Sequence, residues 1–273
     1  MSRTSIALLG LAAVWACSGP LSHAEGLTLT FPDLPHERHD QVPQCHVTLP
    51  KNYDLKKSYP LVVWLEGGDG GDQPHDDFLP AGDYVLAGLP YPKGANHPSV
   101  DYIVGDFPTI WKFHRTMLEE IYRKVPNIDR GASIIAGFSN GAHSIDGMLK
   151  TDLPPEQHLS AYFRIFILVE GGGWPKGDYP DMKGKFAYAA FGENTGASRT
   201  VARVAKGLMA HGAQVHLSEM QNTGHSFADF EKETVKHWLA DEVFPKLHED
   251  GAHPQKPAAA QGSAGTPARY EHP

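Results

Sequence analysis

Apolar residues along this chain gather in short runs, and between the runs they recur at helical spacing. The runs that predict strands are 45–49, 59–65, 84–87, 132–136, 162–169, 185–191 and 214–217. Most of them show no alternation with polar residues, which is typical of strands buried on both faces of a sheet. Helical spacing marks 107–125, 141–149, 200–209 and 227–247. We therefore predict an α/β fold in which a mostly parallel central sheet carries helices on both faces.

The first 24 residues have the pattern of an export signal. Arg3 precedes an apolar run over 6–17, and Ser22–Ala24 has small residues where a signal peptidase would cut. The run is too short for a membrane span, so we expect no integral membrane segment and a mature chain that begins at Glu25. Cys17 offers a lipoprotein anchor as a minor alternative. The expected destination is the periplasm or the outside of the cell, and the pattern does not separate the two.

The other end of the chain, 250–273, is rich in Ala, Gly, Pro and Gln and has almost no large apolar residue. Such a segment cannot bury enough surface to order itself, so we predict a disordered tail. One folded domain over 25–249 remains, of a size that a single α/β domain commonly has.

Charge and cysteine content exclude several classes of function. Lys+Arg 24 against Asp+Glu 32 give a net charge of −8 over 273 residues, which argues against a nucleic-acid partner. Two cysteines exclude a disulfide-dense scaffold and a multi-cysteine zinc site, and Cys45 is expected to be a buried thiol. The histidines of His36–Asp40 lack metal-ligand spacing, so we predict no metal and no cofactor. The oligomeric state stays open.

The sharpest chemical signal is Gly137-Phe138-Ser139-Asn140-Gly141, which follows a buried apolar run and precedes a predicted helix. Strand, sharp turn and helix are the context in which G-x-S-x-G forms a nucleophile elbow. The glycines leave room for the neighbouring backbone, and the helix N-terminus below Ser139 favours developing negative charge.

Together with its lead-in Asn127–Arg130, the elbow resembles the α/β-hydrolase superfamily. It is most similar to secreted esterases of the feruloyl-esterase and polyhydroxyalkanoate-depolymerase type. The order of predicted elements agrees with this superfamily over most of 45–247. The resemblance implies the α/β-hydrolase fold and ester hydrolysis at Ser139.

The resemblance also implies where the other site residues lie. His225, in Gly224-His225 after the last predicted strand, would be the general base. The oxyanion would be held by the backbone N–H of Asn140 and by an N–H of the Gly67–Gly68 region. Glu66 stands where the family usually has histidine, so its carboxylate either braces this loop or repels the oxyanion.

The acid of the triad is the least defined part of the site. The family usually has an aspartate three residues after the glycine that ends the corresponding strand, and this chain has Thr195 there. Three candidates remain, ranked Glu193, then Glu170, then Asp178. Glu193 is adjacent, Glu170 ends the preceding predicted strand, and Asp178 lies on the loop between the two strands.

The sequence thus predicts an exported serine hydrolase that cleaves a small-molecule or polymer-derived carboxylic ester through an acyl-enzyme on Ser139. The missing aspartate keeps an alternative open, a catalytically impaired relative that binds a ligand or a partner protein. A peptidase on the same fold is a third possibility that the residues do not exclude.

Overall fold

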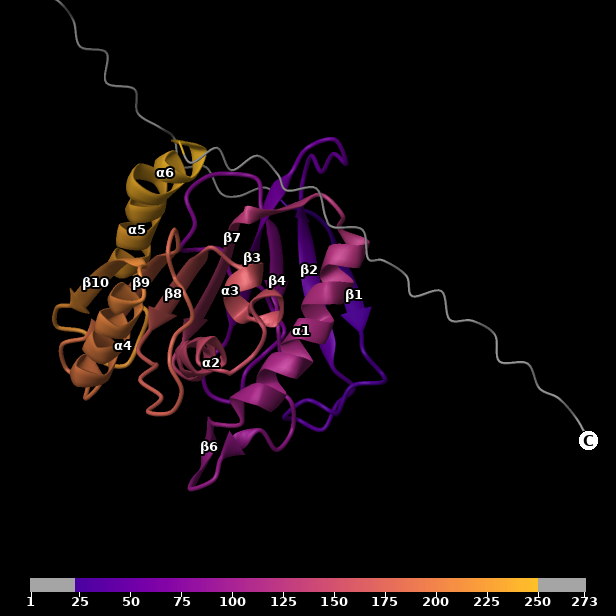
Figure 1. The fold of residues 1–273 in the computed structure, drawn as a ribbon. Helices are drawn as coiled ribbons and strands as arrows, with labels where there is room; N and C mark the ends of the chain where they lie inside the picture. Colours follow the sequence, from indigo (N-terminus) through magenta and orange to yellow (C-terminus); the bar gives the residue numbers. More distant parts are fainter. Residues whose placement is uncertain (1–22, 250–273) are drawn as a thin grey trace, which may run out of the picture.

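The computed structural model describes residues 23–249 and is built around one eight-stranded sheet (Figure 1). The strands of the sheet are β1 (His23–Thr30), β2 (Gln44–Pro50), β3 (Tyr59–Leu65), β4 (Val85–Gly88), β7 (Ile128–Phe138), β8 (Ile165–Val169), β9 (Phe186–Gly192) and β10 (Gln214–Met220), in the spatial order β1-β2-β4-β3-β7-β8-β9-β10. β2 pairs antiparallel with both of its neighbours, β1 and β4. The six strands β4, β3, β7, β8, β9 and β10 run parallel to one another.

Helices cover both faces of this sheet. They are α1 (Phe107–Lys124), α2 (Asn140–Leu149), α3 (Leu159–Tyr162), α4 (Ser198–Ala210), α5 (Asp229–His237) and α6 (Phe244–Glu249), with a short 3-10 turn Pro155–Gln157 and a π-helical segment Trp238–Val243 that joins α5 to α6. The largest apolar cluster joins α1, α2 and α4 to one face, and a second cluster joins α5 and α6 to the other. The predicted three-layer α/β arrangement is confirmed.

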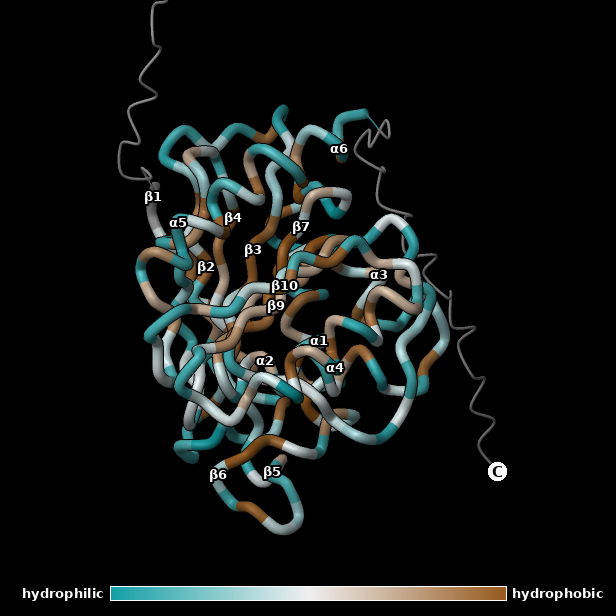
Figure 2. The backbone as a smooth tube through the Cα atoms, turned by 90° about the vertical axis from the view of Figure 1, so that its left-hand side faces the viewer, coloured by the Kyte–Doolittle hydropathy of each residue, from teal (hydrophilic) through white to brown (hydrophobic). Residues whose placement is uncertain are grey.

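The central strands show how the sequence builds this arrangement. In β3, Leu61, Val63 and Leu65 belong to one apolar cluster, whereas Val62 and Trp64 belong to the other. Successive side chains of a strand point to opposite faces, so an unbroken apolar run supplies both cores at once. Figure 2 shows the apolar stretches of β3 and β7 inside the molecule and polar stretches along the outer loops.

Strand β1, the β5–β6 hairpin, the 3-10 turn and helix α3 have no counterpart in the sequence prediction. β1 begins at His23, within the segment predicted to be a signal, of which residues 1–22 lie outside the described residues. The tail predicted over 250–273 also lies outside them. A small hairpin of β5 (Asn96–His97) and β6 (Val100–Val104) projects from one end of the molecule (Figure 2). The start of the run 162–169 belongs to α3, and the strand itself begins at Ile165.

The parallel order brings several loops to one edge of the sheet. The residues that follow β3, β7, β8 and β10 all lie at the carboxyl ends of their strands. In open α/β sheets, ligands bind at this edge. Within 23–249, no helix is both long enough and apolar enough to cross a bilayer.

Candidate active site

Ser139 occupies a sharp turn between β7 and α2. Its φ of 53° and ψ of −112° lie outside the usual regions for a residue with a side chain. The flanking glycines permit the turn: a Cβ on Gly137 would lie 2.5 Å from the carbonyl carbon of Gly141, and a Cβ on Gly141 would lie 2.0 Å from the Leu65 carbonyl oxygen. This is the geometry of a nucleophile elbow.

His225 connects Ser139 to a buried carboxylate. Its Nε2 lies 2.9 Å from Ser139 Oγ, and its Nδ1 lies 3.0 Å from Glu170 Oε2. The His225 side chain is 55% exposed, whereas that of Glu170 is fully buried. The order nucleophile, imidazole and carboxylate is that of a serine-hydrolase triad, in which the carboxylate holds the imidazole in one tautomer.

Glu170 follows the last residue of β8, again with a left-handed backbone, φ 60°. Its Oε1 accepts hydrogen bonds from the Gly192 N–H and from Thr195 Oγ1. Thr195 therefore contacts the acid, although it occupies the position at which the family resemblance predicts the acid itself. The protein contacts of the two oxygens differ: Oε1 faces Gly192 and Thr195, and Oε2 faces His225.

The structure corrects the order of the candidate acids. Glu193, ranked first, is wrong as the partner of His225, because its Oε2 accepts the backbone N–H of Asn222 at 2.8 Å. Asp178 instead faces His211, 3.1 Å from its Nε2. Glu170, the second candidate, holds the position because β8 lies next to β7, so its carboxyl end opens beside the elbow.

Two backbone N–H groups are available for an oxyanion. Within residues 23–249, neither the N–H of Asn140 nor that of Gly68 has an acceptor, whereas the N–H of Gly67 donates to Glu66 Oε1 at 3.0 Å. Of the two N–H groups predicted in the Gly67–Gly68 region, that of Gly68 is therefore the candidate oxyanion donor. Gly67 contributes by its size, since a Cβ there would lie 3.3 Å from Ser139 Cβ and 2.9 Å from the Phe138 ring.

Known structures with the same fold are numerous, but sequence comparison finds nothing. No family model and no curated protein matches the chain. A Bacillus cereus carboxylesterase superposes with a TM-score of 0.55 at 19% identity, over 79% of this chain and 97% of the other. The feruloyl esterase module from Clostridium thermocellum gives 0.53 at 13% identity, over 82% and 88%.

A Pyrococcus horikoshii acylaminoacyl peptidase gives a TM-score of 0.52 at 11% identity, over 80% of this chain and 41% of the other. This chain has the α/β-hydrolase fold.

Glu66 departs from the usual residue of an α/β-hydrolase at this position, and its contacts explain how it fits. Its carboxylate accepts from Trp64 Nε1 at 2.9 Å and from the Gly67 N–H, and it lies 3.2 Å from His75 Nε2. The hydrogen bond from His75 lowers the pKa of Glu66 to about 2, and Glu66 in turn raises the pKa of His75. Of the two alternatives, the contacts favour a brace for the loop.

The loop after Glu170 rests on helix α2. Gly172 N–H donates to His143 Nδ1 at 3.0 Å, and Trp174 N–H donates to Asp146 Oδ2 at 2.7 Å. Burial lowers the pKa of His143 and keeps the ring neutral, so Nδ1 can accept this bond. His143 is thus a structural support for the loop and lies outside the Ser139–His225–Glu170 relay.

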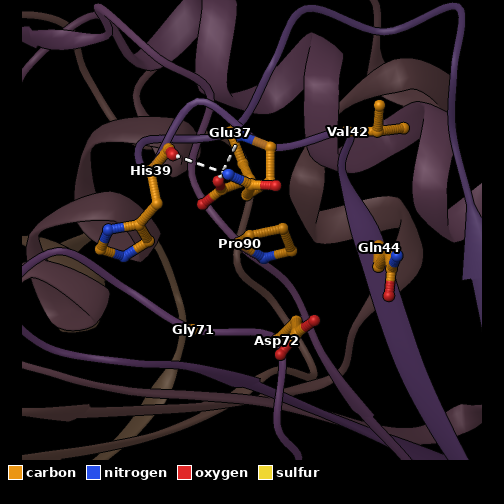
Figure 3. Close-up of a pocket in the computed structure, with 8 residues that line it drawn as sticks. Glu37, His39, Val42, Gln44, Gly71, Asp72 and Pro90 are labelled. Atoms are coloured by element: carbon orange, nitrogen blue, oxygen red, sulfur yellow. Dashed lines mark hydrogen bonds between the residues drawn. The ribbon is translucent and has the colours of Figure 1, made fainter.

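A separate cavity of about 290 Å³ lies beside the loop that contains Gly67 and Gly68. Figure 3 shows its lining, which includes Glu37, His39, Gln44 and Asp72, with Glu37 bonded to the Gln41 N–H at 2.9 Å. Within the described chain, no group of three or more His, Cys, Asp or Glu side chains has the arrangement of a metal site.

Sequence reasoning missed two residues that hold the oxyanion loop. Tyr91 donates its hydroxyl to the Glu66 carbonyl at 2.7 Å, and Arg38 donates to the Gly68 carbonyl at 3.1 Å. Both come from segments that carry no motif. Only the three-dimensional path of the chain brings them to this loop, so no local signal would have found them.

Proposed function

We propose that this chain is a serine hydrolase that cleaves carboxylic esters through an acyl-enzyme on Ser139. The observation that carries the proposal is the continuous hydrogen-bonded relay from Ser139 Oγ through His225 to Glu170. The relay runs from the half-buried Ser139 through the exposed His225 ring to the fully buried Glu170 carboxylate.

In the first half-reaction, Ser139 Oγ attacks the ester carbonyl carbon while its proton passes to His225 Nε2. The tetrahedral oxyanion is stabilised by the N–H groups of Asn140 and Gly68. Glu170 accepts the Nδ1–H of His225 and stabilises the imidazolium. The C–O bond to the alcohol then breaks, and His225 returns the proton to the departing oxygen.

In the second half-reaction, a water molecule loses a proton to His225 and attacks the acyl carbon. The second tetrahedral intermediate uses the same two N–H groups. Its collapse breaks the bond to Ser139 Oγ, which regains a proton from His225, and the carboxylic acid leaves. In this mechanism each proton transfer and each bond change is assigned to Ser139, His225, Glu170, the two N–H groups, the ester or water.

The proposal includes a substrate class and a location. Esters of small molecules or of polymer-derived alcohols are supported by the fold shared with a carboxylesterase and a feruloyl esterase. Export through residues 1–24, to the periplasm or beyond, is supported by the sequence pattern. A peptidase is the second candidate, because an acylaminoacyl peptidase shares the fold. The binding-protein alternative rested on the lack of an aspartate after Gly192. The 3.0 Å contact between Glu170 Oε2 and His225 Nδ1 supports a working triad instead.

The test is reaction of the purified chain from Glu25 onward with a fluorophosphonate probe, alongside Ser139→Ala and the control Ser226→Ala. Ser226 is an exposed neighbour of His225 that has no role in the mechanism. We expect labelling of the wild type and of Ser226→Ala and none of Ser139→Ala. Hydrolysis of 4-nitrophenyl acetate but not of an acylated peptide anilide would separate esterase from peptidase. A folded wild type that resists the probe would overturn the proposal.

A further inference from the structure

The Gly68 carbonyl accepts two hydrogen bonds from side chains that lie far away in the sequence. Asn140 Nδ2 donates at 2.7 Å, and Arg38 Nη1 donates at 3.1 Å. Both donors are held inside the protein: Asn140 is 5% exposed, and the Arg38 side chain is 8% exposed. Hydrogen bonds from a charged group are stronger than those between neutral groups, and both donors here are fixed by largely buried side chains.

The same two side chains also hold the β6 strand of the hairpin. Asn140 Nδ2 donates to the Tyr102 carbonyl at 2.7 Å, and its Oδ1 accepts the Val104 N–H at 3.4 Å. Arg38 Nη2 donates to the Asp101 carbonyl at 3.1 Å. The Asn140 amide thus pairs with the edge of β6 as the backbone of a neighbouring strand would. Two side chains connect elbow, oxyanion loop and hairpin.

The oxyanion loop needs such support from outside. Gly68 has φ 55° and no side chain, and three of its four neighbours from Gly67 to Gly71 are also glycines. Glycine has more backbone freedom than any other residue, so the peptide planes of this loop depend on hydrogen bonds to hold them. The bond from Gly67 N–H to Glu66 and that from Gly70 N–H to the Gly67 carbonyl restrain the first turn. The Gly68 carbonyl is restrained only from outside the loop, by Asn140 and Arg38.

We propose that Arg38 and the side chain of Asn140 are positioning residues that anchor Gly68 by its carbonyl. The Gly68 N–H, on the preceding peptide that the Gly70 N–H bond orients, thereby stays in place for oxyanion binding. This inference rests on the proposed hydrolase function. Asn140 supplies one oxyanion donor from its backbone and, through its side chain, fixes the loop that supplies the other. Asn140 therefore links the two oxyanion donors, its own N–H and that of Gly68, and Arg38 adds a second bond to the Gly68 carbonyl. The same two side chains hold the β5–β6 hairpin. We call this arrangement of Arg38, Asn140, the oxyanion loop and the hairpin the clamp.

The test is a double-mutant cycle of Asn140→Ala and Arg38→Met, with steady-state hydrolysis of 4-nitrophenyl acetate over a range of pH. We expect kcat to fall about tenfold or more in each single variant, because small displacements of catalytic donors are costly. KM should change less than twofold. The pH profile should keep its midpoint, because His225 and Glu170 are untouched. The double variant should lose far less than the product of the two losses, since both act on one carbonyl.

The chain offers a matched control. Asn127 also donates twice to backbone carbonyls and accepts one side-chain bond, but it lies before β7, at the opposite end of the strand from Ser139. Asn127→Ala should lower the melting temperature as much as Asn140→Ala and leave kcat unchanged.

The possible outcomes separate the inference from the function on which it rests. An active wild type with Asn140→Ala and Arg38→Met at wild-type kcat would overturn the clamp alone. Losses that multiply in the double variant would do the same, because they would show two independent effects. Should either variant fail to fold, Arg38→Lys still decides the matter: one ammonium cannot serve both carbonyls as the forked guanidinium does, so kcat must fall. An inactive wild type would overturn the function and the clamp together.

Discussion

Two residues at the centre of the site, Ser139 and Glu170, have a backbone conformation that side chains disfavour. Their φ values are 53° and 60°, and both directly follow neighbouring parallel strands. Such conformations cost on the order of 1–3 kcal/mol each and persist only where the surrounding structure imposes them. In this site the strained backbone directs both side chains out of the sheet edge and toward His225. The strain is thus associated with the relay itself.

Exchange of the acid separates Glu170 from Glu193 directly. Glu170→Gln should lower kcat for 4-nitrophenyl acetate by about 10³–10⁴-fold, because an amide at this position permits the wrong imidazole tautomer. Glu193→Gln loses only an exposed bond to the Asn222 N–H and should change kcat less than twofold. Equal losses in the two variants would contradict the assignment. Circular dichroism of both proteins checks that the fold is intact.

The pair of Glu66 and His75 should give a pH-dependent contribution to stability. The pKa of His75 is raised above 6.5, so its contribution is complete below that pH and is lost as the pH rises through the higher folded-state pKa. The pKa of Glu66 is lowered from 4.5 to about 2, so its contribution is complete above pH 4.5 and is lost on acidification toward pH 2.

His75→Gln should therefore lower the melting temperature most near pH 5.5 and least at pH 9. Both side chains are more than a third exposed, so we expect an effect below about 1 kcal/mol. Thermal unfolding at both pH values, with His237→Gln on the exposed surface as control, provides the measurement. A destabilisation that is the same at both pH values would refute the ion pair.

At the scale of elements, the turn between β7 and α2 tolerates no added atom. Gly141→Ala would place a methyl group 2.0 Å from the Leu65 carbonyl oxygen, which belongs to the backbone of a central strand. We expect a loss of about 3 kcal/mol or more in the free energy of unfolding, since overpacking against backbone cannot be relieved by a rotamer change. Gly196→Ala, where a Cβ meets no atom within 4 Å, should stay within about 0.5 kcal/mol. Urea unfolding of both variants tests the difference.

Elements that bury many apolar residues are predicted well from the sequence. The other elements are predicted poorly. Strands β3, β8 and β9 are unbroken apolar runs, and α1 has a clear apolar stripe, so each is visible from spacing alone. The β5–β6 hairpin escaped prediction because β5 has two residues, and β6 pairs on its other edge with the amide of a single side chain. No local pattern encodes such a partner.

The same division applies to the site. Ser139 is marked by glycines at fixed offsets, because the backbone around its turn leaves no room for a Cβ at Gly137 or Gly141. His225 is marked by its place after the last predicted strand, since a Cβ on Gly224 would meet no atom within 4 Å. The acid carries no such mark. Which carboxylate reaches His225 depends on the path of two loops at the sheet edge, and the spacing after Gly192 favoured Glu193 although that side chain turns to Asn222. Arg38 and Tyr91 depend wholly on tertiary placement.

At the scale of the whole molecule, Cys45 reports on global unfolding. It lies on β2 with no exposed surface, and burial raises the pKa of its thiol. The chain has two cysteines, and the other precedes Glu25, so a chain that begins there carries one thiol. Native protein should leave a chromogenic aromatic disulfide unreacted, and its reaction in rising urea should follow the tryptophan fluorescence curve. Reaction well below the unfolding midpoint would show that the β1–β2 end opens by itself.

The distribution of the relay along the chain has a consequence for biosynthesis. Ser139 and Glu170 lie on adjacent strands only 31 positions apart, whereas His225 follows Glu170 by 55 positions. A ribosome therefore releases nucleophile and acid well before the base, and a nascent chain that stops after β9 holds a strained serine without chemistry. Under the proposed function, hydrolysis begins only when β10 and the loop after it have joined the sheet. Onset of activity during translation would thus mark completion of the fold, and incomplete chains would stay harmless to the cell's own esters.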